Sequence, residues 1–246
     1  MAADPASLAL LYCATLPDNV AVFAQSNGMT TTQVSVDDAD DNAGESAQNT
    51  NVFVISDVTE HRLDRVLLPN VDACVEATPN FCGMDEDVLG RINDSDIFIS
   101  LTTASAYSNE LALHFYRWVA AKIKLNDDLA GNLELALQEA LANGLIHGNM
   151  GLNKTLPDSF HDLESYSETV HEKLESEDAG QKRIEVWGKW DDKELAISIL
   201  DHGAGFDVNA PVEKSVTGWG LNLIRHLAKD IAITDNGCKM TMRFER

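Results

Sequence analysis

The sequence predicts an α/β protein with two units, a smaller one in residues 1–94 and a larger one in residues 95–246. Three observations favour this fold class. Short apolar stretches alternate with helix-like stretches over the first hundred residues, which favours a parallel sheet. Two long helical patterns follow in succession. The last third of the chain contains two pairs of strands with hairpin turns between them.

The first unit is expected to contain strands and helices in alternation. The expected strands are residues 8–12, 31–36, 52–56 and 71–77, and the expected helices are residues 17–28 and 85–93. Gly28 closes the first of these helices, because glycine is favoured just past a helix end. The polar stretch 37–51 has no hydrophobic periodicity, which is typical of a solvated loop.

The second unit is expected to begin with a strand at 96–101, followed by two helices. A helical pattern runs from about Ser105 to Leu125 and carries apolar residues on one broad face. Asn126 is expected to cap the next helix, and Asp127 and Asp128 are favourable in its first turn. The apolar stripe of this second helix is Leu129, Leu133, Leu137, Leu141 and Leu145.

The remaining segments are one polar insertion, two hairpins and one helix. Residues 153–180 are expected to form a loop around a short acidic helix. Strands 183–190 and 194–200 flank the turn Asp-Asp-Lys and predict a hairpin. A helix is expected in the stretch 218–230, opening straight after glycine, and the pair Asn236-Gly237 predicts the turn of the final hairpin.

The composition excludes several classes of function. Forty acidic against 18 basic residues give a formal charge of −22, which would repel a phosphate backbone, so nucleic-acid binding is not expected. The same acidity fits either a well-solvated surface or a face that attracts a basic partner. No stretch is long and apolar enough for a membrane span, and no basic leader is present.

The cysteines favour a cytoplasmic location and give no metal site. The four are scattered without a CxxC pair, which suits a reducing compartment better than a disulfide framework. No Cys/His cluster has the spacing of zinc ligands. They are Cys13, Cys74, Cys82 and Cys238.

Three polar residues recur every four positions on the second helix of the larger unit: Glu139, Asn143 and His147. Residues four apart project from the same side of a helix. An amide oxygen suits Mg²⁺, which usually retains water and shares phosphate oxygens. A nearby carboxylate could orient or deprotonate an attacking hydroxyl or water. Taken alone, the pair Glu139 and Asn143 also fits a helix surface that faces solvent.

Two glycine-containing motifs follow further along the chain. Asp201-His-Gly203-Ala-Gly205 comes just after an apolar strand, where glycines permit close backbone approach and the carboxylate could accept a hydrogen bond from an exocyclic amine. Gly218-Trp-Gly220 precedes a helix, where backbone N–H groups favour anions. Each motif alone also fits an ordinary turn. Neither has the pattern of a P-loop or of a dinucleotide fingerprint.

Together and in this order, the stretches QEALANGLIHG, DHGAGFD and TGWGLNLI resemble the N, G1 and G2 boxes of the GHKL ATPases, the superfamily of gyrase and histidine-kinase ATP-binding domains. The form Glu-Ala-x-x-Asn-x-x-x-His-Gly is most similar to the branch of anti-sigma-factor serine kinases. The resemblance covers about residues 95 to 246. It implies a Bergerat fold, a two-layer sandwich in which helices cover a mixed sheet.

The resemblance assigns roles to two residues of the N box. Asn143 would coordinate the Mg²⁺ that is bound to the ATP phosphates. Glu139 would be the base that activates the acceptor, a serine hydroxyl in a kinase. His147 also matches the family pattern, and for this residue a packing or hydrogen-bonding role is favoured.

The resemblance also assigns roles in the other two boxes. Asp201 would bind the amino group of adenine, and Gly203 and Gly205 would shape that pocket. Gly218 and Gly220 would allow the lid and the helix N-terminus to enclose the phosphates. The segment 152–182 is longer than usual for this branch, so it is either a docking element or an elaborated loop.

The implied function is an ATP-binding serine/threonine kinase-like regulator that transfers the γ-phosphoryl group to a protein partner in bacterial signalling. That partner would resemble an anti-sigma antagonist, a sigma factor or another signalling protein. One alternative is a non-catalytic, ATP-stabilised adaptor. Another is ATP hydrolysis that drives a conformational change, against which the lack of a following transducer domain counts. Histidine autophosphorylation is not expected, since His114 lacks the usual acidic neighbour.

The smaller unit loosely resembles a response-regulator receiver domain. Asp57 directly follows an apolar strand, as a receiver phosphoacceptor does. Cys13 and Ala14, however, stand where a receiver carries the acidic pair that holds Mg²⁺, and without that metal a transferred phosphoryl group is poorly stabilised. The unit is therefore interpreted as a degenerate receiver that serves docking or dimerisation, which makes a homodimer possible, and Asp57 as a strand-end cap.

Overall fold

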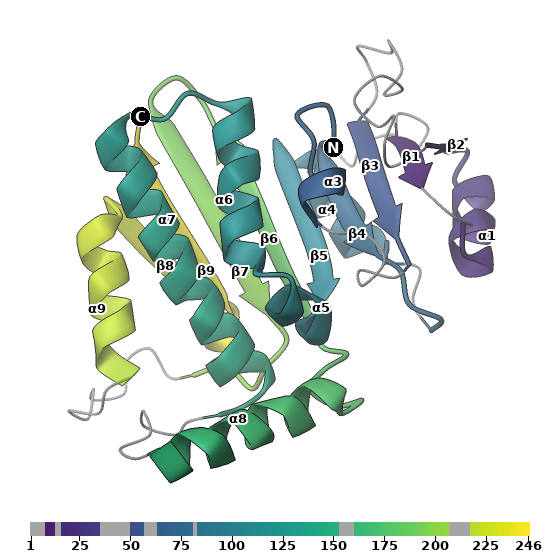
Figure 1. The fold of residues 1–246 in the computed structure, drawn as a ribbon. Coiled ribbons are helices and arrows are strands. Elements are labelled where there is room, and N and C mark those ends of the chain that lie inside the picture. The colour runs from purple at the N-terminus through teal and green to yellow at the C-terminus, as the bar shows by residue number, and fades with distance from the viewer. Residues whose placement is uncertain are drawn as a thin grey trace.

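The computed structural model describes residues 8–12, 16–34, 50–56, 63–80, 83–152, 160–206 and 217–246; for residues 160–162 and 217–219 it describes the backbone only. In these ranges the chain forms a mixed sheet of nine strands with helices on both faces (Figure 1). The strand order is β2-β1-β3-β4-β5-β6-β7-β9-β8. The predicted α/β class is confirmed.

The first five strands of the sheet are parallel to one another. They are β1 (Leu8–Tyr12), β2 (Thr30–Gln33), β3 (Thr50–Ile55), β4 (Ala73–Glu76) and β5 (Ile97–Thr102). Their order, 2-1-3-4-5, is that of flavodoxin-like sheets. Apart from β2, which is exposed, these strands are mostly buried, as parallel strands covered on both faces should be.

The helices between the parallel strands lie on different faces of the sheet. Helices α1 (Asp18–Ser26) and α4 (Glu86–Asn93) pack on one face, and α3 (Leu63–Val66) packs on the other. The connections from β3 to β4 and from β4 to β5 step in the same direction along the sheet, yet their helices lie on opposite faces. One of them therefore has the uncommon left-handed crossover.

The second half of the sheet is antiparallel and continues directly from the first. Strand β5 pairs with β6 (Arg183–Trp190), which pairs with β7 (Glu194–Asp201). Strand β9 (Lys239–Glu245) lies between β7 and β8 (Asp230–Thr234). The two predicted hairpins are thus confirmed. The division into units at residues 94 and 95 stays a prediction, and the sheet runs across it without a break.

The single helix expected from Ser105 to Leu125 is wrong, because the chain forms two helices there. Helix α5 (Thr103–Ser108) ends at Asn109, whose Nδ2 donates to the Ser105 carbonyl at 2.9 Å. Glu110 then adopts a left-handed φ of 47°, which no α-helix of L-residues can continue. Helix α6 (Leu111–Lys122) starts in a new direction and buries the expected apolar face.

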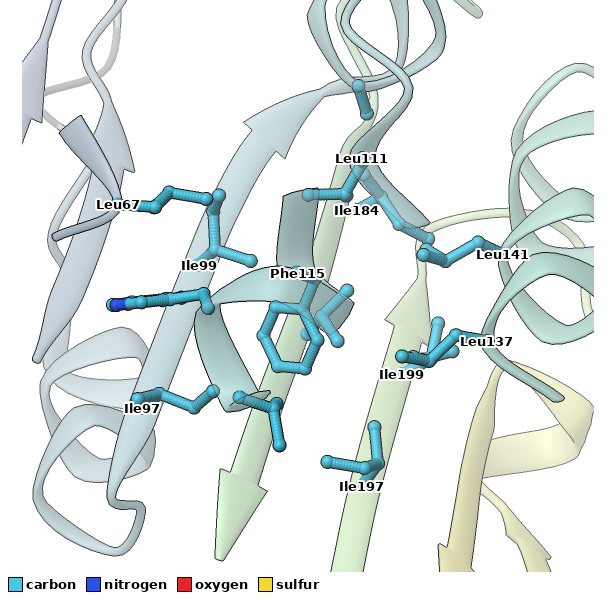
Figure 2. Packing of buried hydrophobic residues seen from close by; sticks show 14 of the residues in the cluster. Leu67, Ile97, Ile99, Leu111, Phe115, Leu137, Leu141, Ile184, Ile197 and Ile199 are labelled. Carbon is cyan, nitrogen blue, oxygen red and sulfur yellow. The ribbon is translucent and has the colours of Figure 1, made fainter. Parts of the chain in front are cut away.

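Helix α7 (Asp127–Ala142) forms as predicted, with Asn126 as its cap. The Asn126 side chain accepts the Leu129 N–H at 2.9 Å, and the leucine stripe is buried. Figure 2 shows Leu137 and Leu141 pointing from α7 toward the strands that carry Ile184 and Ile199. This packing fixes which side of α7 faces away from the sheet.

The predicted helical period changes at Asn143. There α7 passes directly into a π-helix, η2 (Asn143–Asn149). Because the turns of a π-helix are wider, the residues after Asn143 lie on a different side of the helix from the one on which a continuous α-helix would place them. Short π-helical segments in α-helices frequently occur at functional sites.

The remaining elements complete one end of the antiparallel half. Helix α8 (Phe160–Glu175) is longer than the short helix expected and lies across the end of the sheet at which α7 ends (Figure 1). Helix α9 (Thr217–Leu227) packs beside α7, and the turn η3 (Asp235–Gly237) joins β8 to β9. None of the helices in the described ranges combines the length and the apolar character that crossing a membrane requires.

Candidate functional site

The three predicted motifs meet at one end of the antiparallel half. Helix α7 and η2 supply the first motif, the end of β7 the second and the start of α9 the third. In Figure 1 the end of α7 and the start of α9 lie at the same end of the sheet as α8. Two groups of residues can be distinguished there, one around Asp201 and one around Glu139.

Asp201 is a buried acceptor at the end of β7, with 9% of its surface exposed. Its Oδ1 accepts the Gly203 N–H at 2.9 Å, while Oδ2 accepts no hydrogen bond from the described part of the chain. Burial raises the pKa of the Asp201 carboxyl, and the Gly203 N–H and the charges of His202 and Lys182 oppose that rise. A donor from a ligand would therefore meet a desolvated, half-satisfied carboxyl group.

The backbone approaches Asp201 so closely that only glycine fits at two positions. A Cβ at Gly148 would lie 2.5 Å from Asp201 Oδ1, and a Cβ at Gly203 would lie 2.3 Å from the Gly148 carbonyl oxygen. Gly144 lies next to Asp201 one turn earlier. No role was predicted for Gly144 and Gly148 from the sequence, although the two glycines are four residues apart and therefore lie on the same side of the helix.

Asn149 joins η2 to the loop that carries Gly203. This side chain is buried, and its Nδ2 donates to Thr103 Oγ1 at 2.8 Å and to the Arg183 carbonyl at 2.9 Å. Its Oδ1 accepts the His202 N–H at 2.8 Å. Sequence reasoning missed Asn149, because its three partners lie on distant segments and only the fold brings them together.

The G1 loop (residues 201–206) also packs on the turn between β8 and β9. Gly205 has a φ of 71°, and a Cβ there would lie 2.2 Å from the Asn236 carbonyl oxygen. The Phe206 N–H donates to the same oxygen at 3.0 Å, and the Asp201 N–H donates to the Cys238 carbonyl at 3.0 Å. These contacts explain the glycine at position 205, while its role in an adenine pocket stays a prediction.

Glu139 and Asn143 form the second group, on the side of α7 that faces α9. Both side chains are half-buried. A Cβ at Gly220 would lie 2.7 Å from Glu139 Oε2 and 3.6 Å from Asn143 Nδ2, so the start of α9 lies directly against them. Within the described ranges neither side chain forms a hydrogen bond or an ion pair. A carboxylate and an amide are thus adjacent at the start of α9.

His147 does not join this pair. Its Nδ1 lies 2.6 Å from the Leu152 carbonyl oxygen. A carbonyl oxygen only accepts, so this nitrogen carries the proton. The Leu152 N–H in turn donates to the Ile146 carbonyl at 2.9 Å. His147 therefore ties the chain after η2 to the end of the helix, which is the hydrogen-bonding role that the sequence favoured.

The side chains at this site fit Mg²⁺ that is bound together with a nucleotide better than a metal ion held by protein ligands alone. Among the described residues no group of three His, Cys, Asp or Glu side chains could hold a metal ion. Mg²⁺ at nucleotide sites needs only one or two protein ligands, because phosphate oxygens and water supply the rest. Asn143 is the side chain that would supply such a ligand here.

Several predicted residues lie outside the described ranges. They include Asp57, Cys13 and Ala14, on which the receiver resemblance depends, and residues 207–216, which precede α9. Gly218 is described through its backbone alone, as the second residue of α9. The predicted roles of these residues therefore stay predictions.

Comparison with known protein families gives one match. Residues 102–244, more than half of the chain, match the family described as histidine kinase-like ATPase domain. No curated protein matches the chain. The matched residues contain η2, the end of β7 and the start of α9, which are the elements that meet at the site. The chain therefore belongs to the family of histidine kinase-like ATPase domains.

Proposed function

We propose that this chain is an ATP-dependent serine/threonine protein kinase-like regulator of the anti-sigma-factor type, acting in the cytoplasm on a protein partner. The observation that carries the proposal is the pair Glu139 and Asn143, which lies against the start of α9 with no hydrogen bond or ion pair from the described residues. In this reading the N-terminal unit is a docking or dimerisation module.

Asp201 is the adenine-binding residue in this proposal. Its Oδ2 would accept a hydrogen bond from the adenine amino group, while Oδ1 remains bonded to the Gly203 N–H. Buried acceptors without a partner are costly, so a ligand that supplies the missing donor gains affinity and specificity. The glycines at 148 and 203 permit the approach of the backbone that places this carboxyl group.

Glu139 and Asn143 act at the phosphate end. Asn143 would hold Mg²⁺, which neutralises phosphate charge when bound. The N-terminal N–H groups of α9 around Gly218 and Gly220 would bind phosphate oxygens. Glu139 would take the proton of the partner's serine hydroxyl as that oxygen bonds to the γ-phosphorus and the bond to the leaving ADP oxygen breaks.

A second candidate function is a non-catalytic adaptor whose partner-binding surface is stabilised by ATP. The continuity of the sheet through β5 favours it. A ligand that binds only the folded protein stabilises every region that unfolds together with its site. Nucleotide bound beside β7 would then stabilise the N-terminal strands as well.

The test measures binding and transfer separately. MgATP is titrated into the full chain by calorimetry, and γ-labelled ATP is then supplied with serine-bearing partner proteins. Replacing Glu139→Gln should leave binding intact and lower transfer by roughly 10²- to 10⁴-fold, the usual contribution of a general base. Glu134→Gln, on the same helix, serves as the matched control and should change neither.

The outcomes separate the two functions. ATP binding without transfer, unchanged by Glu139→Gln, would rule out the kinase and leave the adaptor. Failure of the chain to bind MgATP, with Asn143→Ala and Asp201→Asn both behaving as the unchanged protein, would rule out both.

A further inference from the structure

The G1 loop is attached to the sheet on both of its faces. Asp201 and His202 are consecutive, so their side chains point to opposite faces at the end of β7. Asp201 lies against η2. His202 lies on the other face, where its Nε2 is 3.4 Å from Oε1 of Glu185 on β6. The loop is therefore held from the face that does not carry the nucleotide site.

Glu185 connects this loop to the N-terminal half of the chain. It is 2% exposed, and its second oxygen, Oε2, lies 2.8 Å from Arg91 Nη1. Arg91 belongs to the last turn of α4, which packs on the face opposite to α7. Arg183, which is half-buried, also contributes positive charge near Glu185. Removing Arg91 or His202 would leave this buried carboxylate less well compensated.

The His202 backbone transmits such a change to Asp201. Its N–H is bonded to Asn149, and the next N–H along the chain, that of Gly203, is bonded to Asp201 Oδ1. Two consecutive amides thus fix the turn that orients the Asp201 carboxyl group. A displacement of the His202 side chain reaches Asp201 through a single peptide unit.

We propose that Glu185 is a positioning residue for nucleotide binding, which acts through His202, and that its ion pair with Arg91 lets the N-terminal half set the nucleotide affinity. This inference rests on the proposed function only in placing the adenine nucleotide at Asp201. Glu185 touches no substrate in this scheme. It maintains the geometry of the turn from the opposite face of the sheet.

The experiment is a double-mutant cycle on nucleotide affinity. The Kd of the full chain for a non-hydrolysable MgATP analogue is measured for Glu185→Gln, for His202→Gln and for the double variant. Each single change should weaken binding by about tenfold, the scale of one hydrogen bond to a charged group. The Kd of the double variant should be no higher than that of whichever single variant binds more weakly, because the two substitutions remove the same contact.

Arg91 provides the second arm. Arg91→Met should weaken binding about as much as Glu185→Gln, and Arg91→Lys, which keeps the charge, should restore most of the affinity. The matched control is Lys122→Met, which breaks the 2.8 Å ion pair between Lys122 of α6 and Asp72 before β4. That pair also joins the two halves but does not contact the G1 loop, so the Kd should stay within about twofold.

Thermal unfolding of every variant accompanies these titrations. The proposal would be overturned if Lys122→Met and Arg91→Met weakened nucleotide binding equally. Additive effects of Glu185→Gln and His202→Gln on the Kd would also overturn it, and so would unchanged Kd values in all Glu185, His202 and Arg91 variants. If Glu185→Gln fails to fold, His202→Gln and Arg91→Met, at more exposed positions, still decide the matter. A wild-type chain that binds no nucleotide would instead refute the proposed function and this inference together.

Discussion

The two ends of the candidate site differ in how far the protein itself completes them. Around Asp201 the backbone of three segments is in contact, and glycines at 148 and 203 leave no room for a side chain. Around Glu139 two polar side chains lie together without a hydrogen bond from the described residues. The first end is thus completed by contacts within the described part of the protein, and the second is the end that we propose the nucleotide completes. Changes to the backbone contacts at the first end should therefore affect stability, and changes at the second should affect chemistry.

Gly203→Ala should give the largest effect and tests how rigid the Asp201 end is. Its Cβ would lie 2.3 Å from a backbone oxygen, which cannot rotate away as a side chain could. We expect a loss of about 3 kcal/mol in the free energy of unfolding, measured by urea denaturation. Gly131→Ala, where a Cβ meets nothing within 4 Å, is the control and should stabilise α7 slightly. A loss below 1 kcal/mol at Gly203 would show that this end can relax.

Asn149→Ala should come next, because it removes the side chain that joins η2 to the G1 loop. The change leaves the His202 N–H, the Arg183 carbonyl and the Thr103 hydroxyl without this partner. We expect a loss of about 2 kcal/mol by the same measurement, together with weaker nucleotide binding. Unchanged binding would show that Asp201 is oriented without Asn149.

Asp201→Asn should change binding more than stability. The side-chain oxygen can still accept the Gly203 N–H, which places the amide NH₂ where Oδ2 is proposed to accept from the ligand, so a donor on the ligand would meet a donor. We expect MgATP affinity to fall by about tenfold to a hundredfold, measured by calorimetry. Retained affinity would place adenine elsewhere.

The pH dependence of stability checks the state of Asp201 independently of any ligand. Burial raises the pKa of this carboxyl in the folded protein, so the folded state binds the proton more tightly than the unfolded state. Its contribution to stability is fully present below the unfolded pKa and is lost as the pH rises through the folded pKa. Asp201→Asn should abolish this loss, so the difference between the two stability curves should grow with pH and then become constant.

Gly220→Ala should have the smallest effect on stability, and it tests the end of the site around Glu139. Its Cβ would meet Glu139 Oε2, the mobile end of a side chain, which can move aside. The free energy of unfolding should change by less than about 1 kcal/mol, in the direction of the helix preference for alanine. Phosphoryl transfer should nevertheless fall by about tenfold or more, since the displaced carboxylate is the proposed base. Unchanged transfer would contradict the assignment of Glu139.

The sequence by itself determined the elements that depend on local patterns. The leucine stripe and the Asn126 cap predicted α7, and the paired strands with their turns predicted both hairpins. The motifs around Asn143, Asp201 and Gly220 predicted which segments would meet. These signals are local, because helix periodicity, caps and turns depend on residues a few positions apart.

Only the tertiary structure decided how these elements are joined. The break at Glu110 and the π-helix at Asn143 interrupt patterns that read as continuous helices, since packing on the sheet outweighs weak local preference. Strand β5 belongs to both halves of one sheet, and Asn149 and Glu185 acquire their partners from segments far apart in the chain. Such contacts leave no periodic trace in the sequence, because they depend on where the fold places each side chain.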